Sequence, residues 1–133
     1  MSIAEWKGIL AIIGGGIGWF FGGFDIIFYL LVLFVAVDYI TGLMCAAVSH
    51  SISSAKGMQG IMKKVLIFLW VGLGHGLDLL LIDHGAPLRT AVIFFYLSNE
   101  GISILENSAM LGLPIPKRLK TLLLQLGEEE HDR

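Results

Sequence analysis

The stretch IIFYLLVLFVAVDYITGLMCAAV, residues 26–48, contains a single charged residue, Asp38, and is otherwise mostly apolar. A helix of about 20 apolar residues crosses the hydrocarbon core of a bilayer, so this stretch predicts a membrane-spanning helix. The composition of the whole chain agrees, because 56% of its 133 residues are hydrophobic and only 15% are charged, whereas soluble domains carry about a quarter of charged residues. We therefore expect an all-α integral membrane protein.

Three further apolar segments lie at residues 6–22, 61–82 and 87–111, so the chain is expected to form three to four transmembrane helices. The first segment leaves two alternatives, because seven of the 17 glycines fall in residues 8–23. It either spans the bilayer by packing closely against another helix or lies flat at the interface. No small-x-small cleavage site follows it, so we expect it to be retained rather than removed as a signal peptide.

The C-terminal part, residues 114–133, is richer in charged residues than the apolar segments. We expect residues 1–113 to form a transmembrane helical domain and residues 114–133 to form a cytoplasmic, charged tail. The spacing of apolar and basic residues in the tail predicts an amphipathic helix, which either lies on the inner leaflet of the membrane or is exposed to solvent without contacting lipid. Basic clusters follow the second and fourth segments, and the positive-inside rule places both in the cytoplasm. The expected membrane-surface basic residues are Lys63, Lys64, Lys117, Arg118 and Lys120.

Polar residues interrupt three of the apolar segments. In residues 94–110, FFYLSNEGISILENSAM, they fill an arc of about 120° of a helix. An ionised glutamate near the bilayer centre costs about 2.5–3.5 kcal/mol, and the large apolar residues between 88 and 105 return only about 4–5 kcal/mol in total, so this helix is a marginal span. The possible lumen-facing residues are Asp38, Thr41, His75, Asp78, Asn99, Glu100, Ser103, Glu106 and Asn107.

Two arrangements would give the polar side chains of these stripes suitable partners. In one, the stripes face each other inside a single helical bundle, where Asp38 or Glu100 bonds to His75 or to a lysine. In the other, they face a water-filled lumen built by several copies, and the two arrangements can follow each other during assembly. Four glycines are expected to pack helices closely: Gly14, Gly18 and Gly22, which stand four residues apart, and Gly42.

Enzymatic function is not expected. His75 and Asp78 are spaced as a base and its orienting acid would be, but no motif places a nucleophile with them. The single Cys45 and the scattered histidines match no metal-ligand spacing, so we expect no metal and no cofactor. Nucleic acid is not an expected partner either; the expected partners are the lipid bilayer and other copies of the chain.

Four stretches carry a resemblance to a known family, in order and in spacing. They are FGGFD (21–25), VDYITGL (37–43), SSAKGMQGIMKK (53–64) and LRTAVIFFYLSNEGISILENSAMLGLPIPKRLK (88–120). The chain resembles the phage holin family that includes the holins of clostridial toxin clusters, over residues 15 to 126. Its segment-2 motif corresponds to Asp38, Thr41 and Gly42, and its segment-4 motif to Asn99, Glu100, Ser103, Glu106 and Asn107.

The resemblance implies a non-enzymatic protein of a bacterial host's cytoplasmic membrane, encoded by a bacteriophage or a phage-derived locus. It implies copies that oligomerise into pore-like lesions at a set time, so that an endolysin reaches the peptidoglycan and the host cell lyses. In some toxin loci a relative assists toxin secretion; no direct contact with either cargo is implied. Two alternatives stay open: a small four-helix transporter of the multidrug type, and a membrane anchor that conducts nothing.

Overall fold

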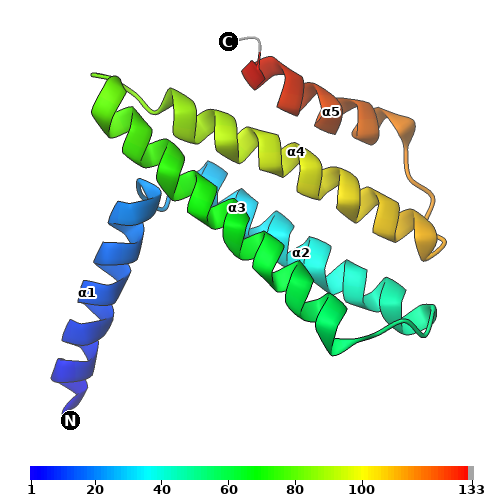
Figure 1. The fold of residues 1–133 in the computed structure, drawn as a ribbon, viewed down its shortest axis with the longest axis horizontal. Helices are drawn as coiled ribbons and strands as arrows, with labels where there is room; N and C mark the ends of the chain where they lie inside the picture. The colour runs from blue at the N-terminus through cyan, green and yellow to red at the C-terminus, as the bar shows by residue number, and fades with distance from the viewer. Residues whose placement is uncertain (132–133) are drawn as a thin grey trace.

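The computed structural model describes residues 1–131 and contains five α-helices (Figure 1). Three of them, α2, α3 and α4, form a bundle; α1 diverges from one end of this bundle, and α5 folds back along α4. Within residues 1–131 there is no strand, which agrees with the expected all-α fold. The helices are α1 (Ile3–Phe21), α2 (Ile26–Val48), α3 (Ser54–Leu81), α4 (Pro87–Met110) and α5 (Lys117–His131).

Local capping residues explain where the helices begin. Ser2 and Glu5 form a reciprocal capping box at the start of α1, and the backbone N–H of Lys56 donates to Ser53 Oγ at 3.1 Å at the start of α3. These serines extend both helices into polar sequence, so α1 and α3 begin before the expected residues 6 and 61. The observed α2 and α4 lie within one residue of the expected segments.

Among the helices of residues 1–131, two meet the length and composition of a membrane span. They are α2 and α3, whose 18-residue apolar windows have mean hydropathies of 2.3 and 1.6. Charged residues near the start of α1, Glu5 and Lys7, and the polar stripe of α4 lower the hydropathy of those two helices. The structure is therefore consistent with a membrane protein, and the expectation of three to four spans stays a prediction.

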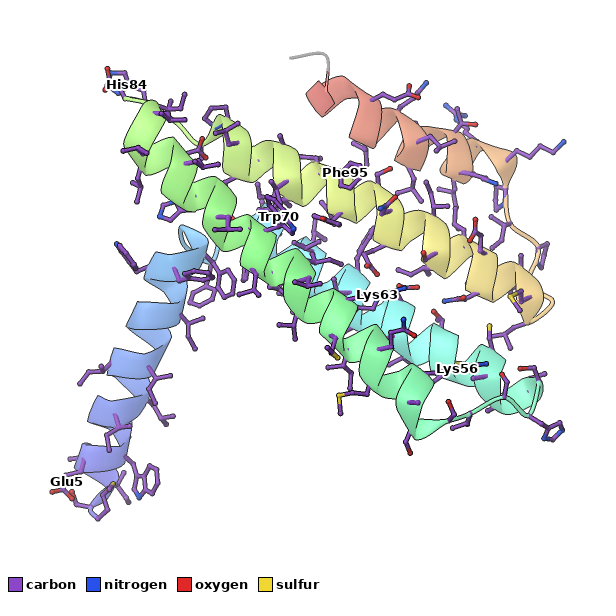
Figure 2. The ribbon with its side chains drawn as sticks, in the orientation of Figure 1. Glu5, Lys56, Lys63, Trp70, His84 and Phe95 are labelled. Atoms are coloured by element: carbon purple, nitrogen blue, oxygen red, sulfur yellow. The ribbon has the colours of Figure 1, made fainter. Side chains whose placement is uncertain are left out.

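The bundle has an apolar half and a polar half. The buried apolar side chains lie toward the end where the α1–α2 turn meets the α3–α4 loop, and the rings of Phe21, Phe28 and Phe68 pack together there. Lys56 and His84 mark the two opposite ends of the bundle (Figure 2). The buried apolar core comprises Phe28, Leu31, Val35, Ile67, Val71, Ile93 and Leu97.

The two outer helices are attached to the bundle in different ways. The backbone of α1 lies beside α3, where the ring of Phe20 lies over Gly72 so closely that a Cβ there would be 2.1 Å from it. The last residue of α1, Phe21, also contacts Phe28 and Arg89. Most of the apolar side chains of α1 are exposed. By contrast, α5 runs along α4, and Ser98 Oγ donates a hydrogen bond to the Leu123 carbonyl at 2.5 Å. The expected domain boundary after residue 113 falls in the linker between these two helices.

Candidate functional site

An ion-pair network joins the three bundle helices in their polar half. Lys64 Nζ lies 2.5 Å from Asp38 Oδ2 and 2.8 Å from Glu100 Oε2. The three side chains are 19%, 12% and 8% exposed, so water screens these charges only in part. Two carboxylates face one ammonium, which leaves a formal charge of −1 on the group when all three are ionised.

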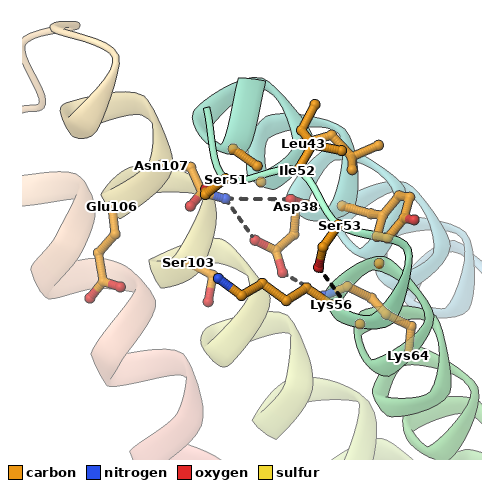
Figure 3. A pocket seen from close by; sticks show the side chains of 15 residues that line it. Asp38, Leu43, Ser51, Ile52, Ser53, Lys56, Lys64, Ser103, Glu106 and Asn107 are labelled. Carbon is orange, nitrogen blue, oxygen red and sulfur yellow. Dashed lines mark hydrogen bonds and ion pairs between the residues drawn. The ribbon is translucent and has the colours of Figure 1, made fainter. Parts of the chain in front are cut away.

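Asn107 extends this network with uncharged hydrogen bonds. Its Nδ2 donates to Asp38 Oδ1 at 3.1 Å (Figure 3). It also donates to Thr41 Oγ1 at 2.9 Å. The Thr41 hydroxyl in turn donates to the Val37 carbonyl at 2.9 Å, and Cys45 Sγ donates to the Asn107 carbonyl. We call Asp38, Thr41, Lys64, Glu100 and Asn107 the central polar cluster. Its bonds satisfy groups that would otherwise be costly to bury in an apolar chain.

The spacing of α4 explains why these groups meet. Glu100, Ser103 and Asn107 stand three and four residues apart, so they share one helical face, and this face is turned toward α2 and α3. Gly42 leaves room beside it, since a Cβ there would lie 3.8 Å from Asn107 Nδ2. Some residues of the polar stripe of α4 are thus already paired within one copy.

The rest of that stripe borders two open pockets. One, of about 330 Å³, lies between α2, α3 and α4 and includes Asp38, Lys56, Lys64 and Asn107 in its wall (Figure 3). The other, of about 720 Å³, is a groove between α3 and α4, which we call the α3–α4 groove. Its polar and aromatic lining consists of Asp38, Lys63, Lys64, Trp70, Tyr96, Asn99, Glu100, Ser103 and Glu106.

Asn99 and Glu106 are the exposed members of the stripe. Both line the α3–α4 groove, and neither takes part in the ion pairs of the central polar cluster. Their side chains therefore remain available for water or for another copy, whereas Glu100 is already paired with Lys64. The structure separates the stripe into a structural part and an open part.

His75 and Asp78 lie in the other half of the bundle, away from the stripe. Asp78 is 3% exposed, and its two carboxylate oxygens accept the backbone N–H groups of Leu88 and Arg89 at 2.9 and 2.8 Å. A carboxylate at a helix N-terminus is favoured by the helix dipole, so Asp78 caps α4. His75 is half-buried beside the α1–α2 turn at Gly22. The structure does not bring these two residues to the α3–α4 groove.

A second buried charge, Arg89, was not among the expected site residues. It is 2% exposed, its guanidinium pairs with Asp25 through bonds of 2.7 and 3.0 Å, and it donates to the Phe21 and Gly23 carbonyls. The Arg89 hydrogen bond holds the pKa of the Asp25 carboxyl below its ordinary value of 3.8. We call Asp25, Asp78 and Arg89, with the Phe21 and Gly23 carbonyls, the Arg89 junction. It ties the α1–α2 turn and the end of α3 to the start of α4.

A comparison with protein families matches the chain over residues 15–128 to the bacteriophage holin family. The chain belongs to the bacteriophage holin family. A probable holin of Bacillus phage phi105 is 33% identical to it over 78% of this chain and 76% of the relative. This membership supports a holin-type function and a membrane location, and it favours a non-enzymatic protein over a catalyst.

Bacterial relatives align over longer stretches of this holin-family chain. An uncharacterised protein of Listeria innocua is 42% identical over the whole of this chain and 98% of the relative. An uncharacterised 14.9 kDa protein of Clostridium perfringens is 43% identical over 84% of this chain and 85% of the relative. No solved structure matches the chain.

The expected basic surface of this holin-family chain requires one correction. Lys63 is exposed on α3, and the three basic residues in the first turn of α5, Lys117, Arg118 and Lys120, are also exposed. Lys64, which was expected to lie at the membrane surface with Lys63, instead lies inside the bundle in the central polar cluster. Adjacent residues of a helix point about 100° apart around its axis, so Lys63 can lie at the surface while Lys64 points into the bundle.

The three glycines of α1 that were expected to pack against another helix, Gly14, Gly18 and Gly22, have different surroundings. A Cβ at Gly14 would meet nothing within 4 Å, whereas one at Gly18 would lie 3.0 Å from the Phe24 ring. Gly22 ends α1 in a left-handed conformation with φ 79°, which glycine adopts without strain. Within one copy of this holin-family chain, Gly14 is therefore free to meet another helix.

Proposed function

We propose that this protein acts as a holin: copies accumulate in a bacterial cytoplasmic membrane, oligomerise and open lesions through which an endolysin or a large toxin passes. The observation that carries the proposal is an apolar helical bundle with a polar groove in its wall, in a chain of the holin family. A lone groove of this kind is poorly matched to lipid. Several copies that turn their grooves toward one another enclose water instead.

The central polar cluster supports a protein that is harmless before it assembles. With Lys64 placed between Asp38 and Glu100, a single copy already pairs the charges of the central polar cluster. The groups left over, Asn99 and Glu106, then favour contact with water shared between copies. Assembly is thus favoured by the open part of the stripe, and the fold of each copy by the paired part.

We infer a topology with the 49–53 loop and the 111–116 linker in the cytoplasm. Its support is that both lie at one end of the bundle, where Cys45 Sγ donates to the Asn107 carbonyl, and that the exposed basic residues Lys56, Lys63 and Lys117 lie toward this end. From this end, α5 folds back along α4. Ser51→Cys and Asp83→Cys, each in a Cys45→Ser background, test it from opposite ends. A thiol reagent that does not cross intact membranes should label only the Asp83→Cys chain, and labelling of Ser51→Cys in intact cells would overturn the topology.

Inducible expression in a bacterium tests the function itself. A holin is expected to cause a sudden loss of membrane potential and then leakage of a large cytoplasmic protein, and to restore lysis to a phage that lacks its own holin. Resistance to a small substrate without leakage would instead favour the transporter alternative. No effect on potential, leakage or lysis would favour the anchor.

A further inference from the structure

The contact between α4 and α5 is close because small residues face each other across it. Ser98 on α4 lies against Gly127 on α5, where a Cβ built on Gly127 would lie 3.2 Å from Ser98 Cβ. One turn nearer the linker, a Cβ at Gly101 would lie 2.9 Å from a methyl group of Leu123. Side chains at these glycines would push the helices apart, so this surface is shaped for one particular helix.

The α5 helix depends on this surface alone. Its backbone lies beside α4 and, among the helices of residues 1–131, beside no other (Figure 1). Residues 111–116 connect the two helices without regular structure, with Gly112 in a left-handed conformation at φ 92° and with two prolines, Pro114 and Pro116. A terminal helix with a single partner can exchange between copies at low cost, because the same contacts form whichever copy supplies the helix.

The outer face of α5 also needs a polar neighbour. Four polar residues of α5, Lys117, Lys120, Gln125 and Glu128, are exposed together with Leu119, Leu122 and Leu124, while Leu123 and Leu126 are turned partly inward. Beside a membrane-spanning α4, those polar groups would face lipid in an isolated copy, which disfavours this position for α5. A neighbouring copy, or water held between copies, removes that conflict.

We propose that α5 docks in trans, so that α5 of one copy occupies the α4 surface of a second copy of this chain. The contacts are those seen within one copy, at Ser98, Gly101, Leu123 and Gly127, because the surface does not depend on which chain supplies the helix. Exchange of α5 would therefore connect two copies through the same α4–α5 contact, without a new interface. This inference rests on the assembly that the proposed function requires.

Cysteine cross-linking between separate chains tests the exchange. In a Cys45→Ser background, one tagged chain carries Ser98→Cys and a second chain with a different tag carries Gly127→Cys, and both are expressed together. The Cβ separation is close to that of natural disulfides, so an oxidant should form a heterodimer. Its yield should be several-fold above that of a control pair in which Gly76→Cys, which faces open space, replaces Ser98→Cys.

A chain with both cysteines completes the test. Docking in trans predicts that this chain forms covalent multimers on oxidation. A disulfide confined to single chains, with heterodimer yield no higher than in the Gly76→Cys control, would overturn exchange. Ser98→Cys with Leu123→Cys repeats the measurement without a side chain at either glycine if Gly127→Cys disturbs the fold, because Ser98 Oγ bonds to the Leu123 carbonyl across the same contact. Permeabilisation by the Cys45→Ser chain is measured in parallel, so that its loss counts against the holin function, whereas the cross-links report on exchange alone.

Discussion

Lys63 and Lys64 are adjacent in sequence but lie in different surroundings. Lys63 is exposed at the mouth of the α3–α4 groove, and Lys64 holds the carboxylates of Asp38 and Glu100. An ammonium that separates two buried carboxylates does more for stability through the repulsion it prevents than through attraction to either one. The two lysines therefore form a matched pair for asking what the central polar cluster contributes.

Lys64→Met is expected to destabilise the fold by about 2 kcal/mol, between the values typical of surface and of fully buried ion pairs. Methionine keeps the apolar stem but leaves Asp38 and Glu100 facing each other without a cation. Unfolding of the detergent-solubilised protein by a denaturing detergent measures the change. Lys63→Met is the control and should change stability by less than about 0.5 kcal/mol. Equal stability of the two variants would mean that the cluster does not support the fold.

The Asp25–Arg89 pair predicts a dependence of stability on pH. Because the folded protein lowers the pKa of Asp25 below 3.8, the pair stabilises the fold above that pH and its contribution is lost as the pH falls through the lower, folded-state pKa. Asp25→Asn should therefore be less stable than the parent protein at pH 7, and the difference should shrink below about pH 4.

Thermal unfolding in a nonionic detergent at both pH values makes this comparison. Asp83→Asn is the matched control, because Asp83 is exposed in the α3–α4 loop. A difference between parent and Asp25→Asn that is the same at both pH values would contradict a role for the ionised pair. Asp25 is about half exposed, so added salt should also reduce the difference.

The spacing of the polar residues leaves two alternatives, a lumen between copies and pairing within one bundle, in which Asp38 or Glu100 bonds to His75 or to a lysine. Within one copy the structure shows the pairing, with Lys64 between both acids, and it does not involve His75. Arg89 is not among the predicted site residues, because an arginine next to a loop is ordinarily exposed to solvent. Its role depends on the α1–α2 turn 64 residues away, and helical periodicity carries no information about such a contact. A lone acid in FGGFD and a lone arginine after Pro87 were the available signals.

Among the elements, α1 differs most from an ordinary helix of a folded protein. Its apolar side chains are largely exposed, and its contacts with the bundle are confined to its C-terminal end, around Phe20 and Phe21. Such a helix is suited to lipid or to helices of other copies. Gly14 faces open space, so a larger side chain there changes what α1 can meet without changing the fold of one copy.

Gly14→Leu is expected to alter assembly through the small-residue face of α1. The oligomer ladder after chemical cross-linking in membranes should change, and lysis should shift in time. Gly16→Leu is the matched control, because Gly16 also faces open space but lies about 200° around the helix. Both changes raise helix propensity equally. An identical ladder for Gly14→Leu and the parent protein would remove α1 from the assembly interface.

Element positions were more predictable than their contacts. Long apolar runs predicted four helices, and the amphipathic pattern after Pro116 predicted the fifth, all of which the structure contains. The early starts of α1 and α3 depend on single capping serines, whose effect on a boundary is local and easily overlooked. That α5 lies along α4 was not predicted, since amphipathicity identifies an apolar face but not what covers it.

At the scale of the whole molecule, apolar and polar halves are stacked along one bundle. Aromatic and aliphatic packing surrounds the Arg89 junction, and the pockets and the central polar cluster lie toward the 49–53 loop. A lesion built from such bundles needs polar walls that do not also hold each copy together. Asn99 and Glu106 satisfy that condition, because they are exposed in the groove outside the central polar cluster.

Asn99→Leu and Glu106→Leu are expected to reduce permeabilisation while leaving the fold intact. Removal of Glu106 should ease membrane insertion by up to about 3 kcal/mol, so lower leakage would not reflect poor insertion. Leakage of a large cytoplasmic protein per inserted chain is the measurement. Gln59→Leu makes a similar polar-to-apolar change outside the groove and should leak normally. Undiminished leakage from both groove variants would show that the groove does not face the lesion.

The Arg89 junction has a mechanical consequence for any change in the bundle's width. One guanidinium and one buried carboxylate fasten the α1–α2 turn, the end of α3 and the start of α4 at a single place, and a close approach of α3 to α4, at Gly74, lies beside it. Helices fastened at one end can separate only by pivoting about that end. Any widening of the bundle would therefore be largest at the opposite end, beside the 49–53 loop.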